Sequence, residues 1–315
     1  MIIVTQGHEQ GIGPEVFIKA ILTSGDKLSQ NILFVGFAQS LESTLKKLNL
    51  PYKIDESGFE IGARTIRAHW LKKVNISESF TALTYGMSLC EKGGHILFTL
   101  PTSKDQFPKG LSGHTEYFRS HYKLPELGMF FLSPELKVLL LSDHIPLREV
   151  PQLSEKILTQ RIELALKTLE KWKWSVTRVL VAGINPHAGE QGLIGDEDQK
   201  LRTSIKNLSP KFKLPILGPY PGDTMQLEQK SPNDLLIYPY HDQGLGIFKS
   251  LQGFIGANVT LGLEYPRFSP DHGTSFSLFG KNKADYRGCS YALAEALKLS
   301  ESLYGRNSRH QSSHS

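Results

Sequence analysis

The sequence is poor in cysteine. It has two, Cys90 and Cys289, in 315 residues, against eleven histidines. Two cysteines cannot build a disulfide framework or a four-thiolate zinc site. A metal site in this chain would therefore have to use imidazole and carboxylate ligands.

Long apolar runs and a strong charge of one sign are also absent. No apolar run approaches the length of a membrane span, and residues 1–7 lack the basic segment and the cleavage site of a signal peptide. We therefore expect a cytoplasmic protein with no membrane partner. The formal net charge is only +5, and the basic residues are scattered without interleaved aromatics, so we expect no nucleic-acid partner either.

Apolar runs that predict strands alternate with amphipathic segments that predict helices. Strands are predicted at residues 2–5, 32–36, 95–99, 137–142, 178–183 and 235–238. Helices are predicted at residues 15–22, 154–170, 197–205 and 291–300, and a further helix follows the strand at 32–36 and ends at about residue 48. Ser154 is a natural N-cap. This alternation is typical of an α/β fold with largely parallel sheets, and the length allows about two domains.

Three of the predicted strands are each followed by a histidine. These residues are His144, His187 and His241. The carboxyl ends of strands in open α/β sheets are where ligands bind. Neutral imidazoles bind borderline divalent metals, so the three histidines predict a metal site at this edge. Asp223 and Asp242 are candidates to orient such ligands or to accept a proton.

A second group of residues suits an anion. Residues 113–116 follow a loop that contains Lys104, Lys249 follows the third histidine, and Arg267 lies nine residues after Asn258. Cations collected around one site would hold a phosphate or a carboxylate. The spacing leaves open whether these cations meet at one site, since each of them alone is typical of the protein surface.

Two further segments contain glycine in predicted turns. Residues 7–15 predict a strand–turn–helix with Pro14 at the start of the helix. They depart from the G-x-G-x-x-G pattern, so a Rossmann dinucleotide site is not predicted. The loop at residues 271–274, which reads Asp-His-Gly-Thr, is of a kind that wraps a nucleotide.

Taken together, these motifs resemble the 4-hydroxythreonine-4-phosphate dehydrogenase (PdxA) family of pyridoxal 5′-phosphate biosynthesis. The matching stretches are residues 11–15, 112–116, 144–148, 185–190, 218–224, 240–244, 258–263 and 271–274, in order along nearly the whole chain. The resemblance implies a fold of the isocitrate/isopropylmalate dehydrogenase type, with two α/β domains, a cleft between them and a homodimer whose active sites are shared between subunits. We expect a nucleotide-binding domain at residues 1–120 and 255–305, a metal-binding and dimerisation domain at 121–254, and a flexible tail at 306–315.

The resemblance also implies roles for single residues. The implied metal ligands are His144, His187 and His241. The implied substrate contacts are His114, Thr115, Lys249, Asn258 and Arg267, and the implied cofactor loop is Asp271, His272, Gly273 and Thr274. For the catalytic base we expect Asp242 or Asp223 first and Lys249 next.

The implied chemistry is an oxidation that depends on NAD and on a divalent metal. The substrate would be 4-phosphooxy-L-threonine, a phosphorylated hydroxy-amino acid, which is oxidised and then decarboxylated to 3-amino-2-oxopropyl phosphate. The metal would polarise the substrate oxygen, and NAD, or NADP as the alternative, would accept the hydride. Neutral imidazoles favour Zn²⁺ or Co²⁺, with Mg²⁺ as the alternative.

Two departures from the family pattern bear on the substrate. His8-Glu9 stands where the family has Asp-Pro, and Leu100 stands where small residues are usual. The alternative substrate is therefore another phosphorylated four-carbon hydroxy acid, D-threonate or erythronate 4-phosphate. A metal-dependent hydrolase that uses the three histidines and a water is a further alternative, which the loop at residues 271–274 disfavours.

Overall fold

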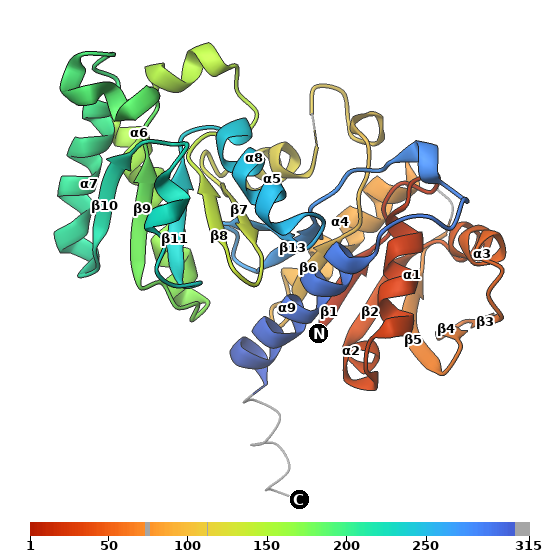
Figure 1. Cartoon of the computed structure of the whole chain (residues 1–315). Helices are drawn as coiled ribbons and strands as arrows, with labels where there is room; N and C mark the ends of the chain where they lie inside the picture. The colour runs from red at the N-terminus through yellow and green to blue at the C-terminus, as the bar shows by residue number, and fades with distance from the viewer. Residues whose placement is uncertain (73–75, 112, 306–315) are drawn as a thin grey trace, which may run out of the picture. The chain divides into compact units, whose positions relative to one another are not determined.

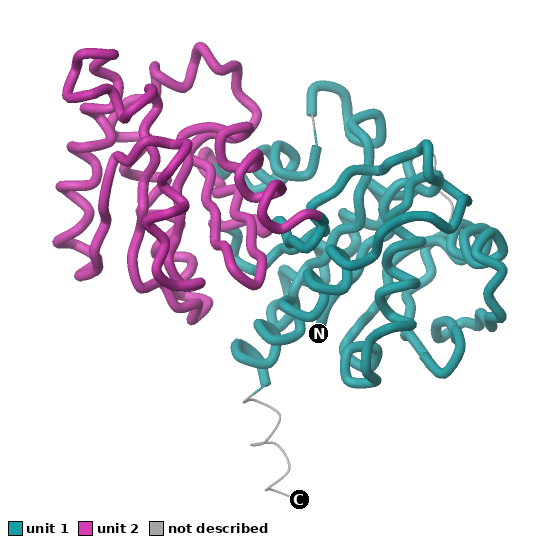
Figure 2. Tube along the Cα trace, in the orientation of Figure 1, with its two compact units in different colours: residues 1–124, 254–258, 263–315 teal, residues 125–253, 259–262 magenta. Residues whose placement is uncertain are grey.

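The chain divides into two compact units, shown in different colours in Figure 2. The computed structural model describes residues 1–72, 76–111 and 113–305. Unit 1 comprises residues 1–124, 254–258 and the chain from 263 on, and unit 2 comprises residues 125–253 and 259–262. The sequence predicts domain boundaries after residues 120 and 254, whereas the structure has them after residues 124 and 253. The prediction also lacks the short segment 259–262, which belongs to unit 2. The predicted tail at 306–315, with His310 and His314, lies outside the described residues.

Unit 1 is built on a sheet whose inner strands are parallel. Its elements are β1 (Ile2–Thr5), α1 (Gly13–Thr23), α2 (Asp26–Gln30), β2 (Ile32–Gly36), α3 (Ala38–Lys47), β3 (Tyr52–Asp55), β4 (Gly58–Ile61), β5 (Arg64–Trp70), α4 (Glu78–Cys90), β6 (Ile96–Thr99), the 3₁₀ turn η1 (Lys104–Gln106), α5 (His114–Tyr122), β13 (Arg267–Pro270), η5 (Phe276–Leu278) and α9 (Arg287–Tyr304). The strand order is β13-β6-β1-β2-β5-β4-β3 (Figure 1). Ile2 of β1 lies opposite Ile32 on one side and Ile96 on the other. Every residue of β1 and β6 is buried, as expected of apolar strands covered on both faces.

Unit 2 has the same α/β character. Its elements are β7 (Gly128–Leu132), β8 (Lys137–Leu140), η2 (Leu147–Gln152), α6 (Glu155–Lys171), β9 (Arg178–Ala182), η3 (Pro186–Gly192), α7 (Asp198–Phe212), β10 (Ile216–Tyr220), η4 (Met225–Glu228), β11 (Asp234–Tyr238) and α8 (His241–Gln252). The strand order is β10-β9-β11-β8-β7, with β12 (Ala257–Leu261) next to β7. Leu236 of β11 lies opposite Val138 of β8 and Leu180 of β9, in parallel register with both.

The sheets are less uniformly parallel than the sequence predicts. β3, β4 and β5 form an antiparallel meander, and β7 pairs antiparallel with β8. The residues of β3 alternate between half-buried and exposed, which is the pattern of a strand with one face toward solvent. Four residues of this kind do not stand out in the sequence, so the meander was not predicted.

Helix α6 confirms a prediction made from its first residues and its spacing. The Ser154 side chain accepts a hydrogen bond from the Ile157 N–H at 3.3 Å and so caps the helix. Leu158, Ile162 and Leu169 recur at helical spacing along this helix, and all three are buried.

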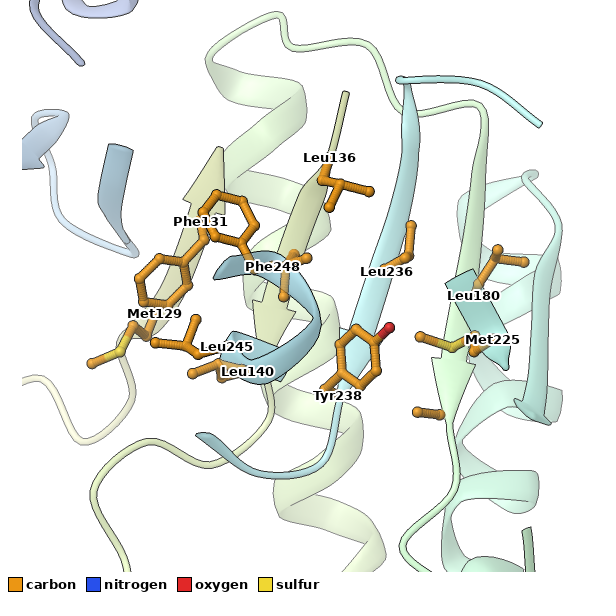
Figure 3. Packing of buried hydrophobic residues seen from close by; sticks show 12 residues of the cluster. Met129, Phe131, Leu136, Leu140, Leu180, Met225, Leu236, Tyr238, Leu245 and Phe248 are labelled. Carbon is orange, nitrogen blue, oxygen red and sulfur yellow. The ribbon is translucent and has the colours of Figure 1, made fainter. Parts of the chain in front are cut away.

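Core packing determines where helix α8 lies. Figure 3 shows Leu245 and Phe248 of α8 lying over the side chains of the neighbouring strands. The rings of Phe248 and Phe131 have their centroids 5.8 Å apart, and Leu140 belongs to the same buried cluster. Because His241 is the first residue of α8, this apolar packing also positions that imidazole.

No helix in the described parts of the chain is long and apolar enough to cross a membrane.

Candidate active site

The three predicted metal ligands follow three neighbouring strands of unit 2. His144, His187 and His241 come after the carboxyl ends of β8, β9 and β11. These strands are adjacent in the sheet, and β11 pairs in parallel with both of the others. The strand order therefore places all three histidines at one edge of one sheet.

Two of these imidazoles lie next to each other. The ring centroids of His144 and His241 are 5.4 Å apart. The His241 Nδ1 atom lies 2.7 Å from the Asp242 Oδ1 atom. In the neutral imidazole this Nδ1–H donates to the carboxylate, which leaves the Nε2 lone pair for a metal. The pair and its orienting carboxylate fit the donor set of a divalent metal such as Zn²⁺.

The described part of one chain does not assemble a complete three-ligand site. In residues 1–72, 76–111 and 113–305, no group of three or more His, Cys, Asp or Glu side chains is placed to hold a metal ion. His187 instead lines a pocket of about 440 Å³ in unit 2. The single chain therefore presents an imidazole pair and, in the same unit, one further imidazole in a pocket.

The pocket that contains His187 also contains a buried amide. Gln243 donates from Nε2 to the Gly183 carbonyl at 3.0 Å, and among the described residues its buried Oε1 has no hydrogen-bond partner. Gly222 makes room for this side chain, since a Cβ there would collide with Gln243 Nε2. The Gln243 amide oxygen is therefore available to a ligand. Gln243 lies in the same helical turn as His241 but is not among the residues predicted from the sequence.

The loop that carries His187 is held by a buried carboxylate. Asp198 is 2% exposed and accepts hydrogen bonds from the N–H groups of Ile184 and Asn185, at 2.6 Å and 3.1 Å. Residues 187–191 all have φ between 42° and 77°, a left-handed conformation that costs L-residues about 1–2 kcal/mol each. The sequence does not single out Asp198, because the N–H groups it binds lie more than ten residues before it.

The three predicted catalytic residues have different surroundings. Asp223 is exposed and lines the pocket together with His187. The Asp242 side chain is 92% exposed and bonds His241, which places it to orient that ring. Lys249 is exposed in the last turn of α8. Among the three, Asp223 has the placement that a general base needs, beside a pocket that admits a ligand.

Unit 1 contains a buried cation. Arg267 is 3% exposed, and its Nε and Nη2 donate to the Thr99 hydroxyl at 3.0 Å and 2.6 Å. Its Cζ atom lies 5.8 Å from the ring centroid of Phe118. Burial lowers the pKa of Arg267 to about 9, so the guanidinium is still charged at neutral pH. A buried guanidinium of this kind favours an anionic ligand.

His114 and Thr115 begin a helix close to this cation. Burial first, and then the charge of Arg267, lower the pKa of His114 well below its usual range, so the imidazole is neutral at pH 7. His114 and Thr115 are the first two residues of α5. The N–H groups of the first turn of a helix have no partner within the helix and favour anions. Of the other predicted substrate contacts, Asn258 lies half-buried in β12 within unit 1, and Lys249 belongs to unit 2.

The predicted cofactor loop, residues 271–274, follows β13 in unit 1. The Thr274 carbonyl accepts a hydrogen bond from the Ile12 N–H at 2.9 Å. A Cβ on Gly11 would lie 3.3 Å from the same carbonyl, so glycine allows the close approach. The His272 Nδ1 atom lies 3.1 Å from the Gly273 carbonyl. The glycine turn before α1 and the predicted cofactor loop are thus joined by their backbones.

His8 and Leu100, which belong to the two departures from the family pattern, are both buried in unit 1. His8 is 8% exposed, accepts a hydrogen bond from the Gln10 N–H at 3.0 Å, and contacts the ring of Phe276 edge-on with centroids 4.8 Å apart. Leu100 is 1% exposed, and a Cβ on Gly13 would lie 3.2 Å from its own Cβ. An aromatic contact and a bulky apolar side chain therefore surround the glycine turn beside the predicted cofactor loop.

The sequence and the fold match known proteins over nearly the whole chain. The family described as "Pyridoxal phosphate biosynthetic protein PdxA" matches residues 30–296. D-threonate 4-phosphate dehydrogenase of Cupriavidus necator is 31% identical over 94% of this chain and 96% of its own length. 4-Hydroxythreonine-4-phosphate dehydrogenase of Zymomonas mobilis is also 31% identical, over 97% and 98%. The structure of 4-hydroxythreonine-4-phosphate dehydrogenase from Klebsiella pneumoniae matches with a TM-score of 0.80 at 28% identity, covering 95% of this chain and 99% of that one.

Fold and sequence together define an α/β enzyme of the dehydrogenase class. The chain belongs to the PdxA family of pyridoxal phosphate biosynthetic proteins. The predicted α/β fold and the predicted family are confirmed, and a dehydrogenase of this family implies a nicotinamide cofactor. The roles assigned to single residues stay predictions.

Proposed function

We propose that this protein oxidises 4-phosphooxy-L-threonine with NAD and a divalent metal, and that the product loses CO₂ to give 3-amino-2-oxopropyl phosphate. The observation that carries the proposal is the His144–His241 pair, with the Asp242 carboxylate on His241 Nδ1. A metal bound there would supply Lewis-acid polarisation of the substrate oxygen, and NAD would supply the two-electron acceptor. Zn²⁺ or Co²⁺ is favoured over Mg²⁺ because the ligands are imidazoles.

The residues of the chain divide the remaining work. Arg267 and the first turn of α5 bind the phosphate or the carboxylate, because both are positive and Arg267 is buried. Lys249 of α8 is assigned to the substrate as well, as a cation for one of its anionic groups. Asp223 takes the proton of the substrate hydroxyl, since it is exposed beside the pocket. The loop at residues 271–274 binds the nucleotide part of the cofactor.

We assign the third metal ligand to a second copy of the chain. The described residues of one copy hold no three-ligand group, and His187 lines a pocket that neither His144 nor His241 lines. A symmetric homodimer would give each copy's pair one imidazole from its partner, so both sites would be complete. This arrangement makes the dimer necessary for metal binding.

Mixing two inactive variants tests the shared site. His144→Ala and His187→Ala should each be inactive, but a mixed dimer contains one site with all three imidazoles intact. Refolding equal amounts together should restore roughly a quarter of the wild-type activity, since roughly half of the dimers are mixed. His144→Ala mixed with His241→Ala is the matched control and should restore nothing. Recovery in the control but not in the first mixture would refute the assignment.

Formation of NADH from two substrates tests the reaction. Protein stripped of metal and reloaded with Zn²⁺, Co²⁺ or Mg²⁺ is assayed with 4-phosphooxy-L-threonine and with D-threonate 4-phosphate, using NAD and NADP. We expect a higher kcat/KM for the threonine derivative with NAD. No NADH from either substrate, with metal binding intact, would refute the dehydrogenase assignment.

D-threonate 4-phosphate is the second candidate because of the changed first turn. His8 replaces the usual Asp and is buried against Phe276, next to the predicted cofactor loop. The two substrates differ at one position, an amine in the first and a hydroxyl in the second. A preference for the threonate in the same assay would transfer the proposal to this substrate.

A further inference from the structure

Unit 1 has a pocket formed where three helices end. Its volume is about 480 Å³, within the range of small-molecule sites. Cys90 ends α4, Tyr122 ends α5 and Tyr304 ends α9, and all three residues line the pocket. The carboxyl end of a helix carries about half a negative charge. Three such ends at one pocket favour a positively charged occupant.

The two charged side chains that line the pocket, Glu91 and Glu264, are both negative, and the described lining residues include no lysine or arginine. Outside the lining, the charge of the Met1 ammonium acts on Cys90. Burial raises the pKa of the Cys90 thiol to about 12, so this thiol is neutral. The His121 Nε2 atom lies 3.6 Å from Glu91 Oε1. Only the protonated imidazole would compete with a bound cation for this carboxylate.

Two tyrosine rings form adjoining walls beside Glu91. Tyr122 donates its hydroxyl hydrogen to Glu91 Oε1 at 2.7 Å, and the Tyr265 hydroxyl bonds the Tyr122 hydroxyl at 2.6 Å. The two ring centroids are 6.2 Å apart, and the ring planes meet at 79°. Burial raises the pKa of both phenols, so both rings stay uncharged at neutral pH. Nearly perpendicular aromatic rings beside a carboxylate are the elements of a cage for ammonium groups.

The pocket has its own lining, although Arg267, which is assigned to the reaction, lies two residues from Tyr265 and its charge acts on that side chain. Helix α5 begins at His114 and ends at Tyr122, and its rise puts these residues about 12 Å apart. None of the predicted catalytic, metal, substrate or cofactor residues lines the pocket. An occupant here would therefore be a ligand distinct from the substrate and the cofactor.

We propose that this pocket binds a small organic cation with an ammonium group. The three helix ends and two carboxylates supply the negative potential, and the Tyr122 and Tyr265 rings supply the faces against which the cation packs. The proposal does not depend on the dehydrogenase reaction.

Calorimetric titration with choline and with its neutral isostere, 3,3-dimethyl-1-butanol, tests the proposal. The full chain is used at about pH 8, where an ordinary imidazole is neutral. We expect choline to bind about tenfold more tightly than the alcohol, because only choline carries the charge. Equal affinities, or no choline binding, would overturn the proposal.

Variants separate the charge from the rings. Glu91→Gln and Tyr265→Leu should each weaken choline binding about fivefold or more, whereas Tyr265→Phe keeps the ring and should stay within about twofold. Glu42→Gln is the matched control, because Glu42 also accepts a tyrosine hydroxyl, from Tyr52 at 2.8 Å, outside the pocket. Melting curves show which variants are folded. A loss in Glu42→Gln as large as in Glu91→Gln would also overturn the proposal.

Discussion

Asp198 allows the structure of the His187 loop to be tested directly. Its carboxylate is 2% exposed and holds the N–H groups of Ile184 and Asn185. A hydrogen bond to an ionised acceptor contributes about 1.5–3 kcal/mol. In Asp198→Asn the side-chain oxygen can still accept from one of these two backbone N–H groups, but as a neutral acceptor. The side-chain NH₂ group then faces the other backbone N–H and cannot accept from it. We therefore expect it to lower the free energy of unfolding by about 2–4 kcal/mol and to release the loop.

Thermal unfolding and metal titration measure the two consequences. A loss of this size should lower the Tm of a chain of 315 residues by roughly 3–6 °C. Metal affinity should fall roughly tenfold or more, because the ligand on the loop is no longer positioned. Glu197→Gln is the control, since the half-buried Glu197 carboxylate accepts from the Asn185 side chain of this loop, at 2.7 Å, and both measurements should stay near wild type. An unchanged Tm and metal affinity in Asp198→Asn would refute the reasoning.

Three further predictions concern the assigned residues. Asp242→Asn should lower metal affinity about 10–100-fold, because the His241 ring loses the carboxylate that orients it, and isothermal titration with Zn²⁺ showing wild-type affinity would contradict this. Arg267→Gln should raise the KM for the phosphorylated substrate about 10–100-fold with a smaller change in kcat, and an unchanged KM would remove Arg267 from the anion site. The pKa of His114 is lowered in the folded protein, so below about pH 6.5 the unfolded state takes up the proton before the folded state does. The free energy of unfolding therefore falls as the pH falls, by at most about 1.4 kcal/mol per pH unit. Urea unfolding at several pH values should show this slope in the wild type and a flatter one in His114→Gln, and equal slopes would contradict it.

Much of the fold could be predicted from local sequence, for a physical reason. A run such as Ile2–Thr5, apolar along its whole length, must be buried on both faces, and this predicts an inner parallel strand. The cap at Ser154 and the stripe on α6 follow from the helical period in the same way. The half-exposed strands β3 and β5 were missed because one face of each is polar.

The candidate site could be predicted in part. The positions of His144, His187 and His241 after strands were readable, because the carboxyl ends of parallel strands share one edge. Their grouping as three ligands of one chain was not readable, and the described residues contain no such group. Strand order places residues at an edge, but side-chain packing decides which of them meet.

The sequence by itself determined the α/β class, the family and the residue types available for chemistry, since these depend on order and spacing along the chain. Only the tertiary structure decided the long-range partners. The bond from Arg267 to Thr99 joins residues 168 positions apart, and Asp198 binds a loop before its own helix. The ends of α4, α5 and α9 likewise meet at one pocket from distant parts of the chain. Such contacts depend on which surfaces pack together, and spacing along a chain does not contain that information.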